Sequence, residues 1–306
     1  MGSTIVVMGI FVADAAFTAA RLPDRGETVM GSGFALGPGG KGSNQAIAAA
    51  RAGGEVHLIT RIGADAFGDL AKVTWADAGV VAHAPVGAAP TGAAFIFLEE
   101  GTGQNAIIVA PGVASEISAA DLRSATNMIA DAAVFLTQLE APMEAVVEGL
   151  RIARAQGVRT ILNPAPAVAL PRDELTLCDL VTPNETEAEG LTGQRVVDVS
   201  SAAEAARLLR AQGAGGAILT LGGQGAWVDA EGRAQHLPAR EFGAVRDTTG
   251  AGDAFNGALA VALSEGASVA EAAAFANAAA AISVTRAGAG ASMAARAEID
   301  ALHVVG

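Results

Sequence analysis

Four short apolar runs, each followed at once by polar or glycine-rich residues, most constrain how this chain can fold. They cover residues 134–139, 160–162, 180–182 and 217–220. Each run has the length of a buried strand, and the segments between them read as helices. Strands that alternate with helices form a parallel sheet covered by helices. In such sheets ligands bind beside the carboxyl ends of the strands, so the polar residues after these runs predict a site along one edge.

The rest of the chain extends this pattern. Further strands are expected at 5–8 and 56–60, and helices at 43–51, 66–78, 254–263 and 269–283. Two β runs, 92–98 and 106–110, flank a hairpin-like turn at 99–104. A hairpin inside a βα chain usually stands apart from the main sheet. We therefore expect one main α/β domain over residues 1–306, with a small β lid drawn from about 11–36 and 92–110 that could cover the site or pair two subunits.

Composition narrows the class of partner. The chain has 306 residues, of which 51% are hydrophobic and 17% charged, as in a well-buried globular protein. Its formal net charge of −13 argues against a nucleic-acid or anionic-membrane partner. No stretch has the roughly 18 apolar residues of a membrane span. The single cysteine, Cys178, rules out an internal disulfide, and no basic segment precedes the first apolar strand, so a cytoplasmic location is expected.

The stretch Gly250-Ala251-Gly252-Asp253 predicts anion binding at the start of a helix. Glycines let consecutive backbone amides point the same way, and the first amides of a helix have no acceptor within it. Such amides bind phosphates. Asp253 is open to two interpretations. It either caps the helix, or it accepts a proton from a hydroxyl that attacks a bound phosphate.

A second glycine-rich segment, residues 37–46, opens the helix expected at 43–51. It lacks the Ser or Thr that follows the lysine of a P-loop, because Gly42 follows Lys41. It matches the dinucleotide fingerprint only weakly, since no acid stands about twenty residues further on. A turn that brings Lys41 and Asn44 close to a small polar ligand, such as a sugar, remains. Asp14 and Glu140 each follow a predicted strand and are candidates for the same ligand.

Taken together, these segments resemble the ribokinase-like, phosphofructokinase-B-type carbohydrate kinases over nearly the whole chain. The resemblance rests on three motifs in this order and spacing: residues 39–46 (Gly-Gly-Lys-Gly-Ser-Asn-Gln-Ala), 182–189 (Thr-Pro-Asn-Glu-Thr-Glu-Ala-Glu) and 247–253 (Asp-Thr-Thr-Gly-Ala-Gly-Asp). The first two are most similar to the ribose-phosphorylating branch. The resemblance implies a three-layer α/β/α fold with a mostly parallel central sheet and a small β-sheet lid.

The resemblance also implies roles position by position. Asp253 would be the base for the sugar's primary hydroxyl, with the amides of Gly250, Ala251 and Gly252 as the anion hole. Sugar-binding residues would be Asp14, Gly39, Gly40, Lys41, Asn44 and Glu140, together with Asp253. Nucleotide-binding residues would be Asn184, Thr220, Gly222, Gly225, Gly252 and Asn277. Glu187 would hold Mg²⁺ through water, and K⁺ would be bound by Asp247, Thr249, Ser283, Arg286, Gly288 and Ser292.

Two features bear on the chemistry that the resemblance implies. A helix N-terminus lowers the pKa of a carboxyl, so Asp253 is expected to be a weak base that takes its proton late in phosphoryl transfer. Members of the family that phosphorylate ribose carry an asparagine where this chain has Val12. Valine cannot pair with a sugar hydroxyl, and an unpaired buried hydroxyl costs roughly 1–3 kcal/mol.

The expected function is transfer of the γ-phosphoryl group of ATP to a primary hydroxyl of a small sugar, with ribose favoured, assisted by Mg²⁺ and K⁺. Alternatives within the family are another sugar, a sugar acid or a nucleoside. A nucleotide-cofactor dehydrogenase rests only on the glycine spacing at 37–42, and a non-catalytic nucleotide- or sugar-binding protein is the alternative of a different class. The expected partners are the sugar, ATP and a second copy of the chain paired through the lid.

Overall fold

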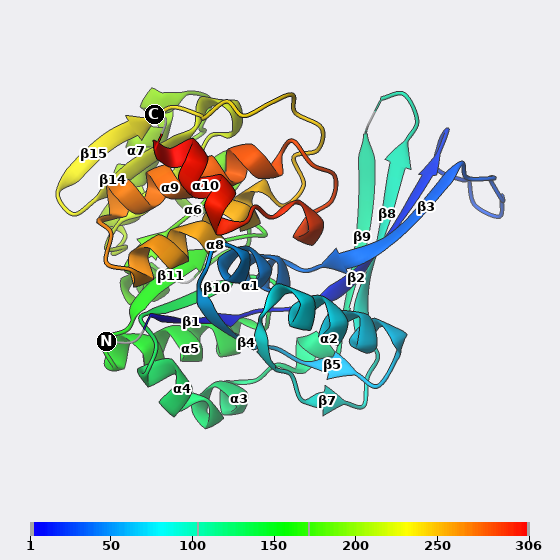
Figure 1. Ribbon diagram of the computed structural model, residues 1–306, viewed down its shortest axis with the longest axis horizontal. Coiled ribbons are helices and arrows are strands. Elements are labelled where there is room, and N and C mark those ends of the chain that lie inside the picture. The colour runs from blue at the N-terminus through cyan, green and yellow to red at the C-terminus, as the bar shows by residue number, and fades with distance from the viewer. Residues whose placement is uncertain (1–2, 103, 171, 305–306) are drawn as a thin grey trace.

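A nine-stranded sheet forms the centre of the computed structural model, which describes residues 3–102, 104–170 and 172–304 (Figure 1). The strand order is β15-β14-β13-β12-β11-β10-β1-β4-β6. The strands, from that first edge to the other, are Arg233–Leu237, Ala226–Ala230, Ala217–Thr220, Leu180–Val181, Arg159–Asn163, Val134–Gln138, Thr4–Met8, Glu55–Ile59 and Val81–His83. Neighbours pair in parallel except at β13–β14 and β14–β15.

The central strands are mostly apolar because helices cover both of their faces. Alternate residues of β1 enter two different cores. Ile5 and Val7 pack with residues of α1 (Lys41–Arg51), α2 (Ala66–Ala78), α8 (Ala251–Ser264) and α9 (Val269–Ser283), near α10 (Arg296–Val304). Val6 and Met8 pack with residues of α3 (Ala119–Ser124), α4 (Thr126–Ala130), α5 (Met143–Ala155), α6 (Glu185–Thr192) and α7 (Val199–Ala211). The period-2 alternation of a strand thus builds a three-layer α/β/α domain.

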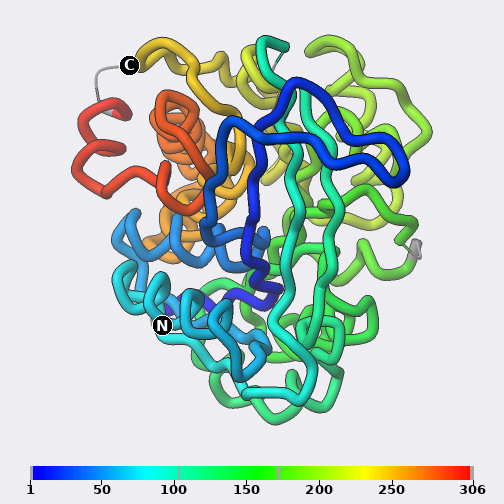
Figure 2. Tube along the Cα trace, turned by 90° about the vertical axis from the view of Figure 1, so that its right-hand side faces the viewer, coloured from blue at the N-terminus to red at the C-terminus, as the bar shows by residue number. Residues whose placement is uncertain are grey.

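A four-stranded sheet projects from this body as the lid (Figures 1 and 2). Its order is β3-β2-β8-β9, with bounds Gly33–Gly39, Val12–Ala19, Thr91–Glu99 and Asn105–Gly112. Its root is buried, because β2 follows β1 after only three residues, of which Ile10 and Phe11 are at most 2% exposed. Strands β5 (Ile62–Gly63) and β7 (Val86–Gly87) form a separate two-stranded sheet. In the chain they follow β4 and precede β8.

The alternation of side chains along each strand divides the lid residues between two faces. Asp14 and its i±2 neighbours lie on one face. The opposite face carries exposed apolar side chains that pair across neighbouring strands: Phe17, Phe34, Leu36, Phe95 and Ile108, between 37% and 69% exposed. The ring of Phe17 contacts two of the others, with centroid distances of 4.9 Å to Phe34 and 5.7 Å to Phe95. We refer to these five residues as the outer lid face.

The fold class predicted from the sequence is confirmed. The predicted helices at 66–78 and 269–283 and the strand at 217–220 agree with α2, α9 and β13 to the residue. The hairpin runs are confirmed as β8 and β9, in a sheet of their own. Gly103, in the turn between them, lies outside the described residues. The sequence analysis did not predict the antiparallel pair β14–β15 at the edge of the main sheet. The division into one domain with a lid stays the one that we propose.

None of the helices within the described ranges is long and apolar enough to cross a lipid bilayer.

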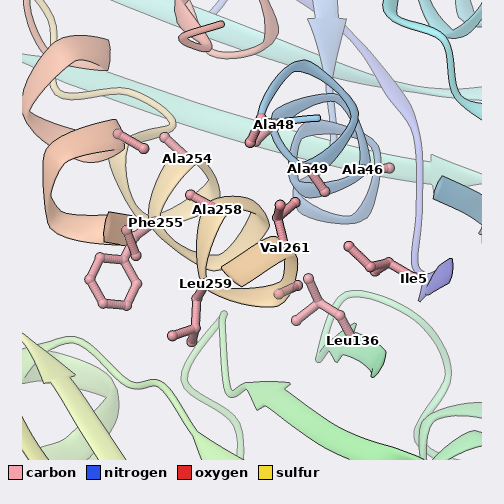
Figure 3. Packing of buried hydrophobic residues seen from close by; sticks show 14 of the residues in the cluster. Ile5, Ala46, Ala48, Ala49, Leu136, Ala254, Phe255, Ala258, Leu259 and Val261 are labelled. Carbon is pink, nitrogen blue, oxygen red and sulfur yellow. The ribbon is translucent and has the colours of Figure 1, made fainter. Parts of the chain in front are cut away.

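Helices α1 and α8 pack closely enough that a glycine is required at their contact. Figure 3 shows Ala48 and Ala49 of α1 beside Ala254 and Ala258 of α8. A Cβ at Gly257 would lie 2.5 Å from the Cβ of Ala48 and 2.7 Å from the backbone oxygen of Gln45. Carbon atoms do not approach this closely, so any larger residue would push the two helices apart.

We expect Gly257→Ala to destabilise the protein by about 1–3 kcal/mol, because the added methyl group overpacks the contact between α1 and α8. Gly190→Ala in α6 is the matched control. A Cβ there meets nothing nearer than 3.6 Å, so the usual gain in helix propensity of about 0.5–1 kcal/mol should appear. Chemical denaturation of both variants measures the difference. A Gly257→Ala protein as stable as the control would contradict this account of the contact.

Candidate active site

Polar residues from the ends of three strands and from the starts of α1 and α8 line one cavity of about 200 Å³. The residues that line it are Lys41, Asn163, Ala165, Thr182, Asn184, Glu187, Thr220, Thr248, Gly250, Ala251, Gly252, Asp253 and Asn256. The cavity lies at the carboxyl ends of the parallel strands β11, β12 and β13, where a sheet of this kind binds its ligand.

The first turn of α8 forms one wall of this cavity. Gly250 precedes the helix with φ of 78°, and a Cβ there would lie 2.9 Å from the Cα of Ala289, so only glycine fits. A Cβ at Gly252 would meet nothing within 4 Å, which leaves open space in front of this residue. The amide of Ala251 donates to the carbonyl of Thr248 at 3.2 Å. One of the three amides predicted for the anion hole therefore already has an acceptor in the turn.

Asp253 is buried, with 6% of its surface exposed, and both of its carboxylate oxygens accept side-chain hydrogen bonds. Asn44 Nδ2 donates to Oδ2 and Gln45 Nε2 donates to Oδ1, each at 3.0 Å. Burial raises the pKa of Asp253, and the charge of Lys41 and the two amides offset part of this. The expectation of a lowered pKa is thus wrong in direction. Loss of water around the carboxylate outweighs the helix N-terminus.

The residues predicted to hold a sugar converge beside Asp253. Asp14 lies on β2, and its carboxylate covers Gly39, where a Cβ would come within 2.2 Å of it. Gly40, with φ of 86°, lets the chain turn from β3 into α1. Glu140 Oε2 accepts a hydrogen bond of 2.7 Å from the backbone amide of Lys41. Asn44 Oδ1 is buried and has no hydrogen-bond partner among the described residues, so it can accept from a ligand hydroxyl.

The carboxyls of Asp14 and Glu140 are both harder to ionise than ordinary acids. Burial, and then the nearby charge of Asp253, raises the pKa of Asp14 to about 6. Burial also raises the pKa of Glu140 to about 7, although Lys41 acts in the opposite direction. Hydroxyl groups that donate to these oxygens favour the ionised forms.

Residues predicted for the nucleotide divide into two groups. Asn184 and Thr220 line the cavity and lie opposite each other in an isolated parallel bridge. Gly222 and Gly225, with φ of 50° and 88°, form the turn after β13 but do not line the cavity. Asn277 does not line it either. Its Nδ2 donates to the carbonyl of Pro238 at 2.6 Å and so holds the segment after β15.

Glu187, predicted to hold Mg²⁺ through water, lies on the cavity wall and also stabilises the start of α6. Its oxygens accept from the amide of Asn184 at 2.9 Å and from its Nδ2 at 3.1 Å, in a capping box. Burial raises the pKa of Glu187. Each carboxylate oxygen keeps a further lone pair for a water ligand of Mg²⁺, so the residue fits this role.

The segments predicted to bind K⁺ lie against each other. Asp247 accepts from the amide of Thr249 at 2.9 Å and from that of Gly288 at 2.8 Å, which joins the two loops. The hydroxyls of Ser283 and Ser292 donate to the carbonyls of Ala280 and Ala289, and Arg286 pairs with Glu298. Backbone carbonyls, hydroxyls and one carboxylate are oxygen ligands of the kind that hard cations take, so these residues fit a cation such as K⁺.

Five residues of the cavity wall were not assigned a role from the sequence: Asn163, Ala165, Thr182, Thr248 and Asn256. Asn163 ends β11, Ala165 follows it, and Thr182 follows β12, so their position at the carboxyl edge of the sheet could have indicated them. Gln45, which contacts Asp253 without lining the cavity, belongs to the 39–46 motif but was given no role of its own. It stands in a helix and reads like any polar residue.

Comparison with known proteins agrees with this geometry. The family model described as pfkB family carbohydrate kinase matches residues 3–296. The chain belongs to this family. It is 40% identical to the ribokinase of Haemophilus influenzae over 300 residues, which is 97% of each chain.

Solved structures of family members extend the similarity to three dimensions. An Arabidopsis thaliana ribokinase complexed with ribose and ATP superposes with a TM-score of 0.90 at 32% identity, covering 99% of both chains. The ribokinase of Thermotoga maritima superposes with a TM-score of 0.89 at 34% identity, again covering 99% of both.

The raised pKa of Glu140 predicts a stability cost that depends on pH. Between the ordinary value of 4.5 and about 7, the folded protein retains a proton that the unfolded chain has released, so stability falls as pH rises through this window. Glu140→Gln removes the penalty. We expect the variant without sugar to melt about 2–5 °C above wild type at pH 8, with the gain disappearing near pH 4.5.

Differential scanning calorimetry across this pH range measures the effect. Glu144→Gln, an exposed acid in the first turn of α5, is the control and should show no such gain. A Glu140→Gln protein that melts at or below wild type at pH 8 would contradict the account of an ionised carboxylate held in a buried site.

Proposed function

We propose that the protein is an ATP-dependent sugar kinase that transfers the γ-phosphoryl group to a primary hydroxyl of ribose. The observation that carries the proposal is the place of Asp253. Its carboxylate lies on the wall of the cavity formed by the start of α8, between the sugar-side residues Asn44 and Lys41 and the open space before Gly252. Membership of the carbohydrate kinase family and similarity to ribokinases support the same activity.

In this mechanism Asp253 removes the proton from the primary hydroxyl of the sugar. The oxygen then bonds to the γ-phosphorus, the bond from that phosphorus to the bridging β-phosphate oxygen breaks, and ADP leaves. Unpaired amides at the start of α8, with Lys41 on the same wall, stabilise the charge on the transferring group. Positioning and charge neutralisation supply most of the rate, because the transition state is loose.

The polar side chains around the sugar fix the orientation of the sugar in the proposed site. Asp14 and Glu140 accept hydrogen bonds from hydroxyls of the sugar, and Asn44 Oδ1 accepts a hydrogen bond from a further hydroxyl. ATP is the co-substrate, and Mg²⁺ held beside its phosphates would neutralise part of their charge. Glu187 would hold that ion through water, and Asp247 with the loop 286–292 would hold K⁺. By holding Thr249 and Gly288 together, Asp247 keeps the loop before α8 in register with the loop after α9.

Replacement of Asp253 tests the proposal directly. We expect Asp253→Asn to lower kcat about 10²–10⁴-fold, since an amide of the same shape cannot accept the proton. ATP affinity, measured by calorimetry, should be nearly unchanged, because the backbone amides remain. The assay couples ADP release to a chromogenic reaction with ribose and ATP. Retention of most of the activity would refute the role of Asp253 as base.

The identity of the sugar is tested by a coupled ADP-release screen over pentoses, hexoses, sugar acids and nucleosides, with and without K⁺. The highest kcat/KM should belong to ribose, and omission of K⁺ should lower it. A higher kcat/KM for a sugar acid or nucleoside would reassign the substrate while leaving the phosphoryl chemistry in place. ATP binding without ADP release from any compound would favour a non-catalytic protein.

Val12 is the position that bears on ribose specificity. It is 4% exposed, shares its face of β2 with Asp14, and stands opposite Gly92, where a Cβ would come within 2.9 Å of Val12 Cγ1. It also belongs to the apolar cluster around β1, so its contact with a sugar stays a prediction.

We expect Val12→Asn to raise kcat/KM for ribose by about 5–100-fold, since one added hydrogen bond contributes about 1–3 kcal/mol when the hydroxyl was left unpaired. Val12→Leu, which adds volume without a polar group, controls for changes in packing. Steady-state kinetics with ribose measures both. An unchanged kcat/KM in Val12→Asn would show that residue 12 does not contact the sugar.

We further propose that two copies of the chain pair through the outer lid face. Five large apolar side chains exposed on one small sheet favour burial against a second surface. Phe34→Glu with Ile108→Glu should convert the dimer to a monomer in sedimentation velocity. Val73→Glu, on α2 and 60% exposed, should leave the dimer intact. Wild-type sedimentation as a monomer would refute this pairing.

A cytoplasmic location also stays a proposal.

A further inference from the structure

Gln45 contacts Asp253 but does not line the cavity. Its side chain is fully buried, at 0% exposed, so it cannot touch a ligand. Its Nε2 donates to Asp253 Oδ1 and to Asn163 Oδ1, each at 3.0 Å, and its Oε1 accepts from Gln138 Nε2 at 2.6 Å. A side-chain amide has two N–H donors, and both of these are used.

The backbone carbonyl of Thr182 fixes the orientation of the Gln45 amide through the side chain of Asn163. Asn163 Nδ2 donates to the carbonyl of Thr182 at 3.0 Å, and a carbonyl can only accept. Asn163 must therefore present its Oδ1 to Gln45, and Gln45 must present its Nε2 to Asn163. The same Nε2 then faces Asp253, so neither amide can reverse without placing two acceptors against each other.

Thr182 also fixes the first turn of α8. Its hydroxyl donates to Asn256 Oδ1 at 2.6 Å, and Asn256 Nδ2 donates to the carbonyl of Gly252 at 2.8 Å. Thr182, directly after β12, thus acts on Asp253 in two ways. It orients the carboxylate through Asn163 and Gln45, and it holds the backbone beside Asp253 through Asn256.

We propose that Gln45 is a positioning residue for phosphoryl transfer, which holds Asp253 Oδ1 so that the free lone pairs of the carboxylate face the sugar hydroxyl. The proposal rests on the assignment of Asp253 as the base. It gives different roles to the two side-chain amides that contact this carboxylate, those of Asn44 and Gln45. Asn44 keeps a free Oδ1 for the ligand, whereas every polar atom of the Gln45 side chain is paired within the protein.

The chemistry of the pair predicts a change in the pH profile. A hydrogen bond donated to a carboxylate stabilises its ionised form, and the amide of Gln45 is one of the groups that offset the effect of burial on the pKa of Asp253. Removal of this donor raises the pKa further. The acid limb of kcat, measured at saturating sugar and ATP, then moves to higher pH. A side chain that only fills space would lower stability and leave that limb in place.

The test compares Gln45→Met with Gln138→Met. The two wild-type residues are at most 1% exposed and are joined by one hydrogen bond, but only Gln45 contacts Asp253. We expect Gln45→Met to lower kcat about 10–100-fold, the size expected for loss of one hydrogen bond to a charged group, and to move the acid limb of kcat upward. Gln138→Met should keep the wild-type limb and lie within about threefold of wild-type kcat.

If Gln45→Met does not fold, as judged by circular dichroism, Gln45→Glu replaces it. That variant keeps the shape and places a second carboxylate against Asp253, which raises the pKa of Asp253 and moves the acid limb upward again.

Two results overturn the proposal: an unshifted acid limb in the folded Gln45 variant, or equal shifts in the Gln45 and Gln138 variants. Failure of the proposed function would look different, because either wild type would release no ADP from any sugar or Asp253→Asn would remain active. An inactive Asp253→Asn protein beside an unshifted Gln45 variant refutes only the role of Gln45.

Discussion

The contact between α1 and α8 is the constraint on which the rest of the site depends. These helices are about two hundred residues apart in the chain, and each contributes part of the proposed site: α1 carries Lys41, Asn44 and Gln45, and α8 carries Asp253. The hydrogen bonds of 3.0 Å that join them exist only because the helices approach as closely as Gly257 and Ala48 allow. A larger separation would leave amides and carboxylate unpaired in a buried place, at a cost of about 1–3 kcal/mol for each group.

Carboxyls collect around a single lysine at the site. Asp14, Glu140, Glu187 and Asp253 all have a raised pKa, with burial as the first cause in each case. Such a cluster disfavours the empty protein and favours a ligand that supplies many hydroxyl donors and brings a cation with its phosphates. The raised pKa values therefore mean that the site without a ligand is less stable at neutral pH, and the ligands of the proposed function would relieve this cost.

The sequence predicted the central sheet and the start of α8 well, because both depend on local patterns. Apolar runs of strand length, and the change from glycines to a helical run at Asp253, can be read within about fifteen residues. The β14–β15 hairpin was not predicted, since its strands are short and β15 is mostly exposed, which gives little apolar alternation.

The properties that the sequence did not predict depend on contacts between distant segments. The direction of the Asp253 pKa required knowing how completely α1 and the strand ends exclude water from it. The partner of Asn277, the Pro238 carbonyl, stands 39 residues away. The proposed role of Gln45 depends on Thr182 and Asn163, which fix the orientation of its amide and are distant from it in the chain.

The buried root of the lid determines which part of this sheet can swing. Ile10, Phe11, Val12 and Ala13 are each at most 4% exposed and pack within the two cores of the body. Asp14 follows directly, so it moves as part of the rigid body. Bending of the lid is therefore confined to the parts of β2 and β8 beyond Asp14, which leaves the carboxylates of Asp14 and Glu140 in place relative to the body.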